Sequence, residues 1–199
     1  MLSTFTAFFD SNVFVGTRLR SLILFLAQSG HFRARWSDDV HREWMAAVLR
    51  NRPSIREETL VAQRRLMDAA VLNCKVNDYE TLIPGLTLPD SDDRHILAAA
   101  IKSSASVIVT FNERDFPAAT LETYGLHARH PDQFIVDLEG LDADAFIGQV
   151  RKDWRHYRAP AIGFRDYVRA LHAAGVPKTA DLLTRLEILF GESPYPPAP

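Results

Sequence analysis

The first two thirds of the chain alternate short apolar runs with longer amphipathic segments. Residues 6–10, Thr-Ala-Phe-Phe-Asp, form an apolar run that ends in an acid, and this pattern predicts a buried strand. Leucine and isoleucine at helical spacing then predict a helix that Gly30 ends. Residues 32–36 predict a second strand, and residues 107–110 predict the clearest strand because they are continuous and β-branched. A weaker strand is predicted over residues 126–128.

Helical patterns separate these strands. Ser37 is a good N-cap residue, and two aspartates follow it in the first turn, where the helix dipole favours acids. Further helices are predicted over residues 55–72, over an Ala-rich stretch at residues 96–101 and over residues 116–124. Strands that alternate with helices indicate a mostly parallel sheet with helices on both faces, which is an α/β fold.

The pattern changes after residue 140, where helical spacing continues without a strand candidate. Helices are predicted over residues 146–157, 164–173 and 179–190. We therefore predict an α/β domain over residues 1–138, an all-helical C-terminal extension over residues 139–192 and a flexible tail over residues 193–199, which is too proline-rich to pack.

Composition narrows the class of protein. The 199 residues include one cysteine, which excludes an internal disulfide and the usual Cys-rich zinc sites. A net charge of −2 argues against coating nucleic acid by bulk charge, but not against a local basic surface. No apolar stretch approaches about 18 residues, and no basic segment precedes an apolar run at the N-terminus. We therefore expect a cytoplasmic protein with no membrane association.

Acidic and amide side chains follow the predicted strands. They are Asp10 and Asn12, then Glu43, then Asp90, Asp92 and Asp93 at the start of the Ala-rich helix, and finally Asn112, Glu113 and Asp115. In an open α/β sheet, ligands bind beyond the carboxyl ends of the strands, so these groups are expected to converge. Crowded carboxylates repel one another unless a hard cation lies among them, and oxygen donors alone favour Mg²⁺ or Mn²⁺ over Zn²⁺. Such a site could activate water against a phosphodiester.

Four motifs in this order resemble those of PIN-domain nucleases, most closely the VapC-type ribonuclease toxins of bacterial toxin–antitoxin pairs. The motifs are Phe9-Asp10-Ser-Asn12-Val-Phe, Glu43, Asp93-Arg-His-Ile96-Leu-Ala-Ala-Ala100 and Val109-Thr110-Phe-Asn112-Glu-Arg-Asp115-Phe116-Pro. The resemblance spans about residues 5–138 and implies a PIN-like three-layer α/β/α fold. The segment after residue 140 resembles the extension of some longer VapC-like proteins.

The resemblance also implies a site and an activity. Asp10, Glu43 and Asp93 would be the three central acids, and Asn112 stands where many relatives carry aspartate. Asp115, one turn further on, could supply the missing carboxylate. The implied protein is a Mg²⁺-dependent endoribonuclease, with Mn²⁺ able to substitute. It would act as the toxin of a type II toxin–antitoxin system, bind a VapB-like antitoxin and form a homodimer.

Two alternatives come from other functional classes. PIN folds can lose their metal and serve as RNA- or protein-binding modules, and Asn112 leaves this open. A phosphoryl-transfer domain with Asp10 as nucleophile is disfavoured, because such domains in the dehalogenase-like class carry a second acid where Asn12 stands here.

Single residues allow competing interpretations. Asn12 could orient Asp10 or bind a phosphate oxygen, or form only a local turn. Asp93 could be a metal ligand or a helix cap. His95, just inside the same helix, is more often a structural group than a base.

Two basic sets could contact RNA. In residues 151–169, Arg155 and Arg158 could hold RNA phosphates while Trp154 and Tyr157 stack on bases. The favoured alternative for that segment is a solvated helix face with its aromatics in the core. A second set near the helix of Glu43 could flank the substrate groove, and it comprises Arg50, Arg52, Arg56, Arg64 and Arg65.

Overall fold

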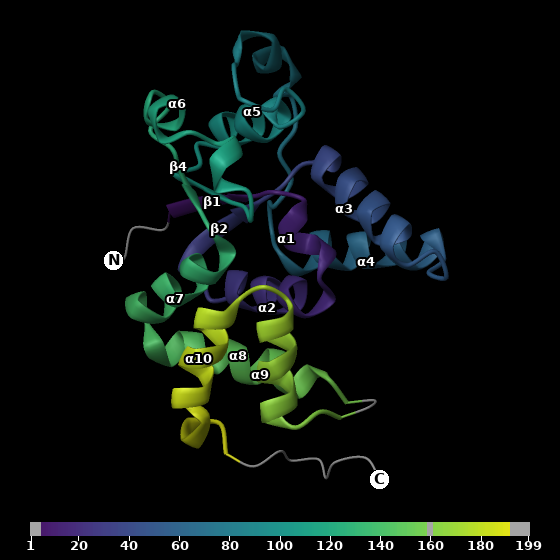
Figure 1. Ribbon diagram of the computed structural model, residues 1–199, viewed down its shortest axis with the longest axis vertical. Coiled ribbons are helices and arrows are strands. Elements are labelled where there is room, and N and C mark those ends of the chain that lie inside the picture. Colours follow the sequence, from purple (N-terminus) through teal and green to yellow (C-terminus); the bar gives the residue numbers. More distant parts are fainter. Residues whose placement is uncertain (1–4, 159–160, 192–199) are drawn as a thin grey trace. The chain divides into compact units, whose positions relative to one another are not determined.

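The computed structural model describes residues 5–158 and 161–191 (Figure 1). The tail predicted over residues 193–199 lies outside these ranges. The contacts between residues divide the chain into two compact units. Unit 1 combines residues 1–15 with 30–130, and unit 2 combines residues 16–29 with 131–199. None of the helices in the described residues is long and apolar enough to cross a membrane.

Unit 1 is built on a four-stranded sheet in the order β2-β1-β3-β4, in which all neighbours are parallel. The strands are β1 (Phe5–Phe9), β2 (Phe32–Arg35), β3 (Val107–Val109) and β4 (His127–Arg129). The central strands β1 and β3 are almost entirely buried, which is why their sequences are continuous apolar runs instead of alternating ones. The four strands predicted from the sequence are all present.

Helices flank this sheet. They are α1 (Asn12–Val15), α3 (Asp38–Asn51), α4 (Glu57–Ala70), α5 (Arg94–Lys102) and α6 (Ala118–Glu122), with 3-10 turns at η1 (Glu80–Gly85) and η2 (Glu113–Asp115). Ser37 caps α3 as predicted, since its Oγ accepts a hydrogen bond from the Val40 backbone N–H at 3.2 Å. The Ala-rich helix α5 packs against β1 and β3 through a fully buried stretch, residues 96–100. The α/β fold is therefore confirmed.

Unit 2 is entirely helical in its described residues. Its helices are α2 (Thr17–Ala27), α7 (Pro131–Leu141), α8 (Ala143–His156), α9 (Phe164–Ala173) and α10 (Pro177–Arg185), followed by the 3-10 turn η3 (Glu187–Leu189). Two features differ from the division made along the sequence. Helix α7 had no predicted counterpart, and α2 packs against α8 and α9 although it is far from them in the chain. Contacts between distant segments decide the place of α2, whereas α7 does carry a local signal, because Phe134, Ile135 and Leu138 are spaced as on one helix face.

A buried carboxylate lies at the centre of unit 2. Asp153 on α8 is fully buried and accepts hydrogen bonds from Ser21 Oγ of α2 at 2.5 Å and from Tyr167 Oη of α9 at 2.7 Å. Burial raises the pKa of Asp153 to about 6, although the two hydroxyl donors partly oppose the shift. One side chain thus joins three helices while its charge is disfavoured by its surroundings.

We predict that the unfolding free energy of Asp153→Asn rises relative to that of wild type as pH increases. The folded pKa lies above the usual value of 3.8, so the stability that Asp153 contributes is complete below that value and is lost as pH rises through about 6. The difference in unfolding free energy between wild type and variant should shift by roughly 2 to 3 kcal/mol across this window. Urea denaturation at several pH values measures it. Asp144→Asn, an exposed aspartate on the same helix, should show no such shift, and parallel curves for Asp153→Asn would contradict the prediction.

Asp132 on α7 caps helix α10 from a distance. Its two carboxylate oxygens accept hydrogen bonds from the backbone N–H groups of Lys178 and Thr179, each at 2.8 Å, and from Thr179 Oγ1 at 2.8 Å. Asp132 and Thr179 are both buried. These bonds satisfy donors at the N-terminus of α10 that have no partner within the helix.

We predict that Asp132→Ala lowers the unfolding free energy by about 1 to 3 kcal/mol, because it removes a cap and leaves buried donors unsatisfied. Asp181→Ala is the matched control, since Asp181 is exposed in the middle of α10. Chemical denaturation of both variants should separate them clearly. Equal stability of the two variants would show that the cap contributes nothing.

Candidate active site

Asp10 directly follows β1 and lies in a hydrogen-bonded setting. Its Oδ2 accepts hydrogen bonds from Thr110 Oγ1 at 2.6 Å and from Asn12 Nδ2 at 2.5 Å, and the residue is only 5% exposed. Burial raises the pKa of Asp10, and the charge of Glu43 adds to this, while the bond from Thr110 lowers it in part. The carboxylate is therefore held in one orientation at a cost in solvation.

Asn12 and Thr110 form the frame around this carboxylate. Asn12 Nδ2 also contacts Thr110 Oγ1 at 3.0 Å, and Asn12 Oδ1 accepts a hydrogen bond from the Phe111 backbone N–H at 3.1 Å. Asn12 thus joins the segment after β1 to the segment after β3 and orients Asp10, as one of its two interpretations predicted. Thr110 is fully buried and was not predicted as a site residue. The parallel register, which pairs Phe9 with Val109, was the signal that would have placed Thr110 beside Asp10.

Asp93 stands at the start of α5 without capping it. Its side chain makes no capping hydrogen bond, whereas the exposed Asp90 forms a local turn by accepting from the Asp92 backbone N–H at 2.9 Å. The pKa of Asp93 is raised to about 6 by burial and then by the charges of Asp10, Asp90 and Asp115. The structure therefore gives no support to the cap interpretation and places Asp93 within reach of other acids.

Glu43 on α3 is paired with a histidine of α5. His95 Nε2 lies 2.7 Å from Glu43 Oε1, and the Glu43 side chain is 43% exposed. Burial alone would lower the pKa of His95, but the bond to Glu43 and the nearby acids outweigh it, so this pKa is raised. The sequence had favoured a structural role for His95, and its contact with a predicted site residue was missed.

Two residues, Asn112 and Asp115, are candidates for the fourth acidic position implied by the motifs. Asn112 is exposed, and its backbone N–H donates to Thr110 Oγ1 at 3.0 Å. Asp115, in the turn η2, is half-buried, and its charge contributes to the raised pKa of Asp93. Of these two residues, Asp115 is the one that adds a charge to the acidic group.

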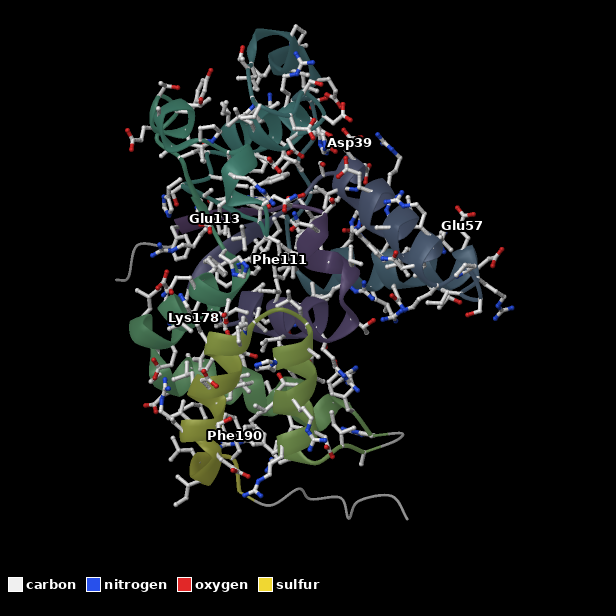
Figure 2. All side chains as sticks on the ribbon, in the orientation of Figure 1. Asp39, Glu57, Phe111, Glu113, Lys178 and Phe190 are labelled. Carbon is white, nitrogen blue, oxygen red and sulfur yellow. The ribbon has the colours of Figure 1, made fainter. Side chains whose placement is uncertain are left out.

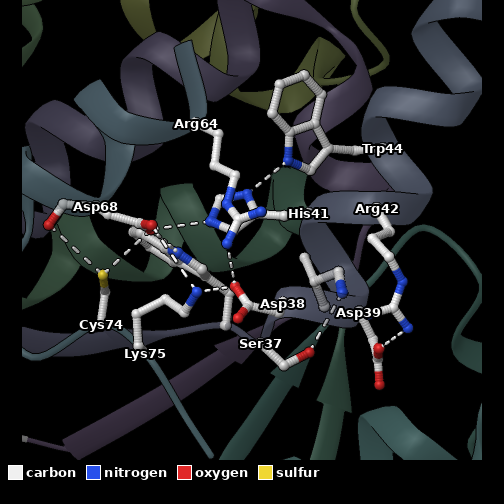
Figure 3. A network of polar contacts seen from close by, with 12 residues as sticks. Ser37, Asp38, Asp39, His41, Arg42, Trp44, Arg64, Asp68, Cys74 and Lys75 are labelled. Atoms are coloured by element: carbon white, nitrogen blue, oxygen red, sulfur yellow. Dashed lines mark hydrogen bonds and ion pairs between the residues drawn. The ribbon is translucent and has the colours of Figure 1, made fainter. Parts of the chain in front are cut away.

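A buried polar network fixes the helix that carries Glu43 (Figure 3). Asp68 Oδ1 of α4 accepts from Trp36 Nε1 at 2.8 Å and contacts His41 Nε2 at 2.8 Å, while Trp44 Nε1 donates to His41 Nδ1 at 2.9 Å. Since an indole N–H can only donate, His41 Nδ1 must accept and Nε2 must carry the proton. Burial lowers the pKa of His41, although Asp68 opposes the shift. Helix α3 is therefore anchored to α4 and to the segment after β2.

Comparison with known families agrees with this architecture. A family model described as "PIN domain" matches residues 6–114, which is more than half of the chain. The chain belongs to the PIN-domain family. A second model, described as "VapC50 C-terminal domain", matches residues 131–185 in unit 2. The two matches confirm the resemblance to VapC-type PIN proteins.

One curated relative is similar over a short stretch. It is named "Putative ribonuclease VapC50", comes from Mycobacterium tuberculosis (strain ATCC 25618 / H37Rv), and is 51% identical over 53 residues. The stretch covers 27% of this chain and 31% of that protein. No solved structure matches the chain.

The donor set of this PIN domain suits a hard cation that is held loosely. Among the described residues, no three His, Cys, Asp or Glu side chains form a ready-made metal-binding group. The acids are nevertheless close enough for Asp10 and Asp115 to raise the pKa of Asp93. Their donors are all oxygen, and Mg²⁺ usually keeps several waters and takes only one or two carboxylates from the protein. The residues present therefore fit Mg²⁺ or Mn²⁺ better than Zn²⁺.

The two arginines predicted to bind RNA belong to unit 2, not to the PIN unit. Arg155 and Arg158 are both exposed. Trp154 is buried, and its Nε1 donates to the Ile162 carbonyl at 2.9 Å, so it is a core residue, as the favoured alternative predicted. The Tyr157 ring is covered by an arginine guanidinium, that of Arg18, at 3.7 Å. Neither aromatic ring is arranged to stack on a base.

We predict that, without metal, Asp93→Asn is at least as stable as wild type. The raised pKa shows that the fold disfavours this charge, so the neutral amide should raise the melting temperature by about 2 to 4 °C at pH values above 6, for a stabilisation of about 1 kcal/mol after solvent screening. The difference should shrink as pH falls from about 6 and vanish near 3.8, because Asp93 is then protonated in both the folded and the unfolded protein. Thermal melts in EDTA measure both effects. Asp92→Asn, an exposed neighbour, is the control, and a lower melting temperature for Asp93→Asn alone would restore the cap interpretation.

Proposed function

We propose that this protein is a Mg²⁺-dependent endoribonuclease that hydrolyses phosphodiester bonds of RNA. The observation that carries the proposal is the group of carboxylates beyond the strand ends, where hydrogen bonds from Thr110 and Asn12 hold Asp10. Burial, and then the charges of Asp10 and other acids, raises the pKa of Asp93 in this group. Carboxylates that repel one another in this way are stabilised by a divalent cation. Membership of the PIN-domain family and the ribonuclease name of the curated relative support the same activity.

Each acid has a distinct part in the proposed site. Asp10 is held rigidly by Thr110 and Asn12, and we assign it, with Asp93 and Asp115, to metal binding. Glu43 is assigned there too, with one oxygen engaged by His95. A bound Mg²⁺ ion, or Mn²⁺ in its place, would lower the pKa of a coordinated water and neutralise charge that develops on the phosphate. Asn112 lies exposed beside these acids, where its amide could contact the RNA backbone.

The biological setting is proposed by analogy with the VapC type. We propose that the protein is the toxin of a type II toxin–antitoxin pair, bound by a VapB-like antitoxin, that it forms a homodimer, and that it acts in the cytoplasm. Arg155 and Arg158 of unit 2 are proposed to hold RNA phosphates, because both are exposed cations on one short segment.

A second candidate is a metal-free RNA- or protein-binding module. The observation in its favour is that no three acidic, histidine or cysteine side chains form a ready-made metal group in the described part of the chain. Metal titration separates the two, since only the nuclease needs a cation.

We predict that Asp10→Asn and Asp115→Asn each lower the rate of RNA cleavage at least about a hundredfold, because loss of a metal-binding charge removes several kcal/mol of transition-state stabilisation. Both variants should also bind Mn²⁺ more weakly by calorimetry. Glu113→Gln is the matched control for Asp115, since Glu113 is an exposed acid in the same turn, and it should cleave normally. Full cleavage by Asp10→Asn, or equal Mn²⁺ binding by all four proteins, would contradict the proposed nuclease.

A further inference from the structure

Three exposed arginines lie at the tip of the hairpin formed by α3 and α4. Arg50 is in the last turn of α3, Arg52 follows that helix, and Arg56 immediately precedes α4. All three are exposed, and none forms an ion pair with a described residue. Of the other cations on these helices, Arg42 is paired with Asp39 and Arg64 with Asp38, while the exposed Arg65 lies further along α4, away from the tip.

The hairpin tip is continuous with the candidate active site along one helix. Glu43 and Arg50 are seven residues apart on α3, so they lie on nearly the same face, about 10 Å apart along the helix axis. Between them this face carries only the methyl side chains of Ala46 and Ala47. The opposite face of α3 is the buried one, through Val40, His41, Trp44 and Val48.

The positive charge of the hairpin tip is confined to a short segment of the chain. Residues 50–56 contain three arginines and no acid, and the first acids after them, Glu57 and Glu58, lie in the first turn of α4, where the helix dipole stabilises them. Figure 2 labels Glu57 at the end of the hairpin, where side chains that end in nitrogen and in oxygen both occur. In a protein of net charge −2, unpaired guanidinium groups beside an acidic site suit a polyanion that would otherwise be repelled.

We propose that Arg50, Arg52 and Arg56 bind RNA phosphates next to the bond that is cut. This inference rests on the proposed nuclease function and assigns it a substrate-binding surface. A nucleic-acid strand in a duplex carries one charge per about 3.4 Å of helix axis, so the path from Glu43 to Arg50 corresponds to about three phosphates. Unit 1 would then contain both the acids of the candidate active site and the arginines that position the RNA strand beside them.

The test compares two double variants with equal loss of charge. Arg50→Gln with Arg56→Gln alters the tip, whereas Arg33→Gln with Lys102→Gln removes two exposed cations at the other end of the sheet, at the start of β2 and the end of α5. Each is combined with Asp10→Asn to prevent cleavage. Fluorescence anisotropy with a labelled RNA stem-loop that has a single-stranded tail gives the affinity over a series of salt concentrations.

The tip variant should bind this RNA at least roughly tenfold more weakly at 0.1 M salt, and its log–log salt slope should fall by about 1.4 to 1.8, the loss of two phosphate contacts. The control should match the parent protein. If both double variants bind like the parent, the tip assignment is overturned while the nuclease proposal stands. If the Asp10→Asn parent does not bind this RNA and the wild-type protein does not cleave total RNA with Mn²⁺, the nuclease proposal itself fails. Thermal melts of both variants should match the parent because all four side chains are exposed.

Discussion

The parallel pairing of β1 with β3 is the constraint on which the candidate site depends. It aligns Phe9 with Val109, and so the next residues, Asp10 and Thr110, come to lie side by side as the two strands end. The 2.6 Å hydrogen bond from Thr110 then holds the carboxylate, and Asn12 closes the frame through the Phe111 backbone. A slip of one residue in this register would turn Asp10 to the other face of the sheet and remove the site.

The acids of the candidate site lower the stability of the fold, because their charged forms are disfavoured where they lie. Burial raises the pKa of both Asp10 and Asp93, and the charges of neighbouring acids raise each of them further. The apolar layer formed by β1, β3 and the Ala-rich face of α5 offsets this cost, since its buried side chains are apolar except for that of Thr6. The well-packed sheet and helix are what allow a group of acids to persist at one edge.

The sequence predicted the strands, the parallel sheet and the order of the acids, because each depends on local pattern or on residue type. Other features depended on contacts between distant segments and could not be predicted in this way. The assignment of α2 to the helical unit follows from its packing on α8 and α9. The pairing of His95 with Glu43 requires α3 and α5 to meet, and the buried Asp153 looks in the sequence like an ordinary acid on a basic helix. Helix α7 was missed although its buried residues Phe134, Ile135 and Leu138 stand at helical spacing, which is a local signal.

Unit 1 contains two histidines whose pKa values are shifted in opposite directions. His41 is fully buried with both ring nitrogens engaged by Asp68 and Trp44, so burial dominates, its pKa falls and it stays neutral. His95 meets a half-exposed Glu43 and other acids, so electrostatics dominate and its pKa rises. His41 joins the start of α3 to α4, whereas the contact between His95 and Glu43 joins α3 to α5 through a partner that solvent can reach. Helix α3 therefore contacts its neighbours in two ways, through a buried histidine at its start and through the half-exposed Glu43 on its outer part.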